Sequence, residues 1–77
     1  MDYKERLIAE YMELKAKYAK LHKMLVLADA GKLEFTPTSP IELLREQANA
    51  MGRYLYILEV RAQWENVDLP GEASING

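Results

Sequence analysis

The apolar positions between residues 7 and 28 recur with the period of a helix. They alternate at intervals of four and three residues, through Leu7, Tyr11, Leu14, Tyr18, Leu21, Leu25 and Ala28. This alternation is typical of a helix that packs along one seam against a neighbouring helix. The pattern predicts a helix over residues 2–30. Gly31 is well placed to end that helix, because glycine adopts the left-handed conformation of a C-terminal cap without steric cost.

A second helical pattern follows a loop over residues 31–39. Pro37 in this loop and Pro40 directly after it stop the first helix from continuing. The run Ser39-Pro40-Ile41-Glu42 is a start signal, with serine as N-cap, proline at the first helical position and glutamate closing a capping box. The apolar stripe of this helix is Ile41, Leu44, Ala48, Met51, Leu55, Leu58 and Ala62. A helix is therefore expected over residues 40–66.

Two long helices joined by a short loop predict an all-α fold, an antiparallel helical hairpin over residues 1–66. Residues 67–77 carry a proline, glycines and small polar side chains without a helical period, which predicts an extended or flexible tail. Gly52 lies inside the second helix, where glycine costs about 1 kcal/mol relative to alanine. Either a close backbone approach compensates for this cost, or the position tolerates it.

The second helix is apolar around more of its circumference than one neighbour can cover. A further stripe runs through Leu43, Ala50, Ile57 and Trp64. On the first helix, Ile8 and Met12 flank the main seam in the same way. Since a large exposed apolar surface usually marks an interface, we expect these six residues to form the contacts of a homo-oligomeric helical bundle. A heteromeric protein partner is the alternative.

A polar row lies between the two stripes of the second helix. Gln47, Tyr54 and Arg61 are seven residues apart, so they point in nearly the same direction. Such residues can fix register and oligomeric state in a helical assembly. Alternatively, they can bind an anionic or planar ligand, with tyrosine stacking on a base and arginine making paired contacts to phosphate. The pattern leaves both roles open.

Further basic and aromatic residues beside the first seam extend the candidate ligand site. Lys15 lies near the seam with Tyr11, and Tyr3 and Arg6 near the N-terminus can reach the site from a neighbouring chain. If the ligand role holds, the predicted ligand-binding residues are Tyr11, Lys15, Gln47, Tyr54, Arg61, Arg6 and Tyr3.

Composition narrows the class of protein. Seventy-seven residues bury only a thin core, so a partner subunit is expected to contribute to stability. A net charge of −2 argues against broad binding to nucleic acid or anionic membranes. No apolar run has the length of a membrane span and the N-terminus lacks the layout of a signal peptide, which together predict a cytoplasmic protein.

Catalytic and metal-binding chemistry find little support in the sequence. There is no cysteine, and His22 is the only histidine, without the companions that a metal site requires. No nucleophile is paired with an obvious base, and no glycine-rich phosphate loop is present. We therefore expect no catalytic residue, no metal and no cofactor, and we interpret the chain as a non-enzymatic protein.

Two runs, DYKERLIAEYMELK from Asp2 and LLREQANAMGRYLYILEVRA from Leu43, resemble a family of short helical-hairpin proteins of gut bacteriophages and prophages, including those related to crAss-like phages. The matching positions are Arg6, Tyr11, Leu14, Gln47, Met51, Tyr54, Leu55, Leu58 and Arg61. The resemblance covers both helices and leaves out the tail. It implies a phage accessory protein, acting in the host cytoplasm, and assigns no catalytic residue.

The resemblance suggests a function when it is combined with the polar row. Phage accessory proteins of this size often counter host defence, and some helical-hairpin oligomers act as sponges for cyclic nucleotide signals. We therefore predict an oligomer that binds and sequesters a small cyclic nucleotide at its subunit interfaces. Two alternatives stay open: an inhibitor or adaptor that lays an apolar helix face against a host protein, and a structural or scaffolding oligomer.

Overall fold

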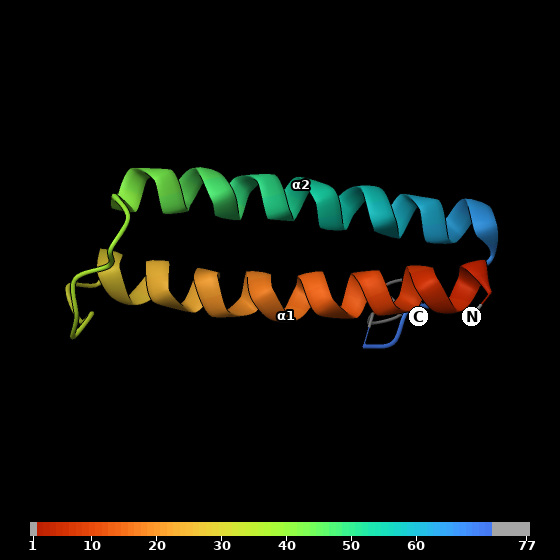
Figure 1. Cartoon of the computed structure of the whole chain (residues 1–77), viewed down its shortest axis with the longest axis horizontal. Coiled ribbons are helices and arrows are strands. Elements are labelled where there is room, and N and C mark those ends of the chain that lie inside the picture. Colours follow the sequence, from red (N-terminus) through yellow and green to blue (C-terminus); the bar gives the residue numbers. More distant parts are fainter. Residues whose placement is uncertain (1, 72–77) are drawn as a thin grey trace.

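The computed structural model describes residues 2–71 and consists of two helices packed side by side in opposite directions (Figure 1). Helix α1 spans Tyr3–Asp29 and helix α2 spans Ile41–Glu65. The connecting loop turns the chain at one end of the hairpin, so the N-terminus of α1 lies beside the C-terminus of α2. The prediction of an all-α helical hairpin is confirmed.

Both ends of α1 are capped by local hydrogen bonds. The Asp2 carboxylate accepts a hydrogen bond from the Glu5 backbone N–H at 2.8 Å, and the Glu5 carboxylate accepts one from the Asp2 N–H at 3.4 Å. These two bonds form a capping box. At the other end Gly31 has a φ of 72°, and the Lys32 N–H donates to the Leu27 carbonyl at 2.8 Å. Gly31 therefore ends the helix in a left-handed conformation, as its position predicts.

The start of α2 differs from the prediction. Ser39 was expected to be the N-cap, but Pro40 takes that position with an extended ψ of 142°, and no side chain makes a capping hydrogen bond. The Pro40 carbonyl accepts from the backbone N–H groups of Leu43 and Leu44, at 3.1 and 3.2 Å. Because the helix begins one residue later than expected, Glu42 is no longer three residues after the cap, and the predicted capping box does not form.

The hydrophobic core is built from three segments: the N-terminal half of α1, the C-terminal half of α2 and the chain that follows α2. Its buried members are Leu7, Tyr11, Leu55, Leu58, Ala62, Val67 and Leu69. Ile8, Leu14 and Tyr18 pack against this cluster.

The first residues of the predicted extended or flexible tail pack into the core. Asn66 ends α2 in the left-handed region with a φ of 57°, and the Val67 N–H donates to the Ala62 carbonyl at 2.9 Å. This turn directs the chain back toward α1 (Figure 1). Val67 and Leu69 are buried in the core. Hydrophobic side chains without a helical period can still fill a core when a helix cap redirects the backbone. The rest of the predicted tail, residues 72–77, lies outside the described residues.

An ion pair joins the two helices at the loop end. Arg45 of α2 donates to both carboxylate oxygens of Asp29, at 2.8 and 3.2 Å. These hydrogen bonds lower the pKa of Asp29 from its usual value and raise the pKa of Arg45. Both side chains are well exposed, so the pair contributes little to stability and mainly orients the ends of the helices.

Replacing Gly52 with alanine is expected to stabilise the hairpin by about 0.5–1 kcal/mol, because alanine is the better helix former. A methyl group at this position would lie 3.6 Å from Cε1 of Tyr18, which is an ordinary van der Waals contact. The close backbone approach that would require glycine is therefore absent. Urea denaturation of both proteins at one concentration measures the change. A loss of stability would show that a tighter contact, within or between chains, needs the glycine.

Candidate functional site

The polar row of α2 lies on the surface of the hairpin. Gln47, Tyr54 and Arg61 are all exposed, with 42% of Tyr54 accessible to solvent. The Arg61 Nε donates to the Glu65 carboxylate at 3.2 Å, a pair within one helix turn. About half of the Arg61 side chain stays accessible. The row therefore presents an amide, a phenol and a guanidinium to whatever covers this side of α2.

Tyr11 does not share this surface. Only 1% of Tyr11 is exposed, and its hydroxyl donates to the Glu59 carboxylate at 3.1 Å. The Lys15 ammonium lies 5.3 Å from the centre of the Tyr11 ring and 3.5 Å from the carbonyl oxygen of Gly71. Tyr11 is thus a core residue of the protomer. The reason is that the chain after α2 covers the seam beside it, which helical spacing alone does not indicate.

Helix geometry separates the candidate residues into two faces. At 100° per residue, Tyr54 and Glu59 point about 140° apart, with the core stripe of α2 between them. Since Glu59 reaches Tyr11 on one side of the hairpin, Tyr54 faces the other side. Arg6 is nine residues from Lys15, which directs it about 180° away on α1. Arg6 therefore lies on the side of Tyr54.

The predicted ligand set accordingly divides into two parts. Five of its members, from both helices, are exposed and directed toward the face of the polar row, here called the α2 face: Tyr3, Arg6, Gln47, Tyr54 and Arg61. Tyr3 lies one turn before Arg6 and is half exposed. Lys15 lies on the opposite face, so one protomer does not bring it to Tyr54. Only a second copy of the chain can supply Lys15 to a site on the α2 face.

The predicted oligomer contacts divide in the same way. Leu43, Ala50, Ile57 and Trp64 are all exposed on the α2 face, and Trp64 is 83% accessible. Ile8 and Met12 lie on the flank of Lys15, and Ile8 is partly buried against the core. The larger unpartnered apolar surface is therefore the stripe on α2.

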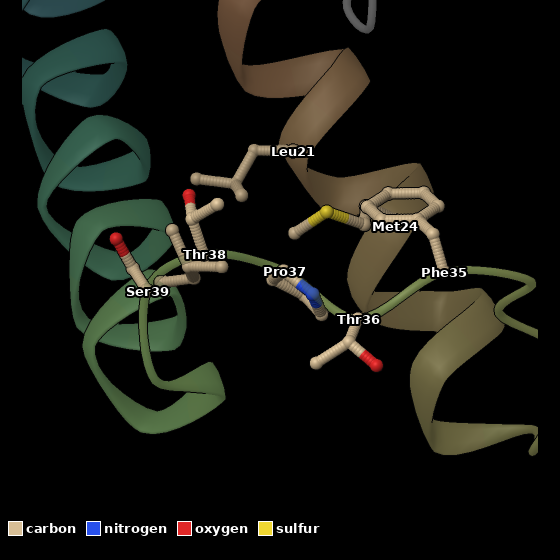
Figure 2. A pocket seen from close by; sticks show the side chains of 8 residues that line it. Leu21, Met24, Phe35, Thr36, Pro37, Thr38 and Ser39 are labelled. Carbon is tan, nitrogen blue, oxygen red and sulfur yellow. The ribbon is translucent and has the colours of Figure 1, made fainter.

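A shallow hollow near the loop was not predicted from the sequence (Figure 2). It has a volume of about 370 Å³ and lies between the C-terminal half of α1, the loop and the start of α2. Its lining is formed by Leu21, Met24, Phe35, Thr36, Pro37, Thr38, Ser39 and Leu44. Phe35 is 60% exposed at its edge. The loop has no periodic pattern, so only its three-dimensional path brings these side chains together.

The described part of the chain offers no arrangement typical of a metal centre or a membrane span. Among residues 2–71, no group of three histidine or acidic side chains is placed to hold a metal ion. His22 instead stacks on Tyr18, with ring centres 5.7 Å apart. Neither helix, within these residues, is long and apolar enough to cross a membrane.

The fold and this surface define a small helical hairpin that carries a row of exposed polar side chains, Gln47, Tyr54 and Arg61, along α2. The chain belongs to the Sequestin family, whose model matches residues 1–64. The match covers both helices as far as Trp64, and the family name is compatible with a protein that sequesters a ligand or partner. No curated protein and no solved structure matches the chain.

Proposed function

We propose that this chain is a non-enzymatic phage accessory protein that counters host defence by sequestering a small cyclic nucleotide in the host cytoplasm. The observation that carries the proposal is the grouping of Tyr54, Arg61 and Arg6 on one exposed face. A nucleotide needs a stacking surface for its base and cations for its phosphates, and this face offers both. Membership of the Sequestin family supports a sequestering role.

The site we propose is a surface site shared between subunits. Each protomer contributes a narrow row of polar side chains beside an apolar stripe, and such a row alone encloses little of a ligand. Small-molecule sites usually bury most of their ligand. A second subunit against the α2 face would cover the ligand and exclude water, which strengthens the contacts of arginine with phosphate.

A thermal-shift screen against cyclic di- and trinucleotides and cyclic ADP-ribose isomers tests the proposal. A ligand present at 100 times its dissociation constant stabilises the folded state by about 2.7 kcal/mol, which is readily detected. For the ligand that gives the shift, replacing Arg61 with alanine is expected to weaken binding about tenfold or more, because a charge-assisted contact to phosphate is lost.

Lys4→Ala is the matched control, because it also removes one exposed positive charge but points within about 20° of Lys15, away from the α2 face. It should leave the thermal shift unchanged. Equal weakening by both substitutions would indicate that general charge, and not the α2 face, attracts the ligand.

The exposed apolar stripe with Trp64 favours a second candidate function, a protein-binding inhibitor or adaptor. Tryptophan is enriched among the residues that dominate binding energy at protein interfaces. This candidate predicts no shift with any nucleotide, together with recovery of one stoichiometric protein partner from infected cells. The two results separate the candidates, since a sponge requires saturable nucleotide binding by the purified protein alone.

A further inference from the structure

The polar row and the apolar stripe of α2 together form one regular seam. Their positions alternate at intervals of four and three residues, through Leu43, Gln47, Ala50, Tyr54, Ile57, Arg61 and Trp64. Every one of these residues is exposed in the hairpin. A continuous heptad seam of this kind is the surface with which one helix packs along another. The intramolecular core uses a different stripe of α2, so this seam is unoccupied within the protomer.

We infer that this seam pairs with the same seam of a second copy, with the two α2 helices running antiparallel about a two-fold axis near Tyr54. The pairing itself is argued from the residues of α2, and only the identity of the ligand that it would hold rests on the proposed function. The antiparallel direction follows from how size and charge are distributed along α2.

Side-chain size favours the antiparallel pairing. When the helix is reversed about a point midway between Arg53 and Tyr54, Trp64 comes level with Leu43 of the second copy, and Ile57 comes level with Ala50. Each level then joins a larger side chain to a smaller one, which suits close packing. A parallel pair would instead place Trp64 against Trp64 and Ala50 against Ala50, crowding one level and leaving space at another.

Charge favours the same direction. Antiparallel pairing brings Glu46 level with Arg61 of the second copy, so opposite charges meet at each end of the seam. Parallel pairing would bring Arg61 level with Arg61 and Glu46 level with Glu46, and like charges at an interface are unfavourable. The two helix dipoles are also opposed in the antiparallel pair.

The pairing completes the candidate site with residues from both copies. The two Tyr54 side chains lie near the axis, and Arg61 of each copy comes within one residue of the level of Gln47 of the other. The N-terminal end of α1, which carries Tyr3 and Arg6, lies beside the C-terminal end of α2, which carries Arg61 (Figure 1). Each dimer therefore carries two equivalent clusters, each with cations from one copy and an amide from the other, on either side of a central pair of tyrosines.

Disulfide cross-linking of single-cysteine variants tests the arrangement without any ligand, and the natural chain has no cysteine to interfere. A disulfide requires Cα atoms within about 7 Å. Tyr54→Cys lies near the axis and is expected to shift to the mass of a covalent dimer on oxidation. Leu43→Cys alone is expected to stay monomeric, because its two copies would be roughly 32 Å apart along the helices.

The decisive sample mixes Leu43→Cys with Trp64→Cys, which are predicted to cross-link to each other. Tyr56→Cys, which points about 160° away from Tyr54 and is 64% exposed, controls for random collision. Ready self-cross-linking of Leu43→Cys would demonstrate a parallel pair and overturn the inference. A monomer by native mass spectrometry, with no variant cross-linking above the control, would overturn it as well.

Nucleotide binding is measured separately on the unmodified protein. A failure of the inferred helix pairing can therefore be distinguished from a failure of the proposed nucleotide binding. If the predicted cross-links form but no nucleotide gives a thermal shift, the α2 pair is supported and the proposed sequestration of a nucleotide is contradicted. A nucleotide shift without the cross-links would keep the proposed function and place its subunit contacts elsewhere.

Discussion

Replacing Leu58 with alanine is expected to lower the free energy of unfolding by about 2–5 kcal/mol, which is typical of a fully buried leucine. Leu58 is completely inaccessible to solvent and lies in the core cluster where α2 meets α1 and the chain after α2. The loss has two parts: the transfer free energy of the deleted carbon atoms, and the cavity that the neighbours fill only partly. Since total stability in small domains is only about 5–15 kcal/mol, this change removes a large share of it.

Thermal unfolding followed by circular dichroism measures the effect, and for a domain of this size we expect the melting temperature to fall by about 8 °C or more. Val60→Ala is the matched control, because it also shortens an aliphatic side chain of α2, at an exposed position. Its effect should stay within about 0.5 kcal/mol. Both proteins are compared at one concentration, since self-association would make the melting temperature concentration-dependent. A Leu58→Ala protein as stable as the control would contradict the packing described above.

Replacing Tyr11 with alanine is expected to be about as damaging, at roughly 3–5 kcal/mol, because a nearly buried aromatic ring is deleted from the same core. Tyr11→Phe separates the two contributions of this side chain. It keeps the ring and removes only the hydroxyl that donates to Glu59, so it should cost about 0.5–1.5 kcal/mol.

Urea denaturation of the two Tyr11 variants gives both values. Once a nucleotide that binds the natural protein is found, the same Tyr11→Phe protein should bind it with unchanged affinity, because the hydroxyl faces Glu59 and not the α2 face. A tenfold loss of affinity with little loss of stability would return Tyr11 to the ligand site and contradict its structural role.

Tyr11 and Tyr54 lie in different environments, which the spacing of residues along the helices does not distinguish. Both are tyrosines beside an apolar seam, and spacing along the helix treats them alike. In the folded hairpin one is covered by Leu69 and its neighbours while the other stays exposed. The difference comes from the turn at Asn66, a residue whose left-handed conformation sends the chain back over one flank of the hairpin and leaves the other uncovered.

The periodicity of the chain by itself determined the two helices, their antiparallel packing and the stripes that form the core, because helical geometry maps spacing directly onto direction. The seam through Tyr54 and Arg61 was also visible at that level. Only the tertiary structure decided which flank of α1 lies on the same side of the hairpin as the polar row of α2. This arrangement separates Lys15 from Tyr54. The tertiary structure also brought Val67 and Leu69 into the core and formed the hollow at the loop. These features depend on contacts between segments distant in sequence and on backbone without regular secondary structure. Neither produces a periodic pattern of residues in the sequence.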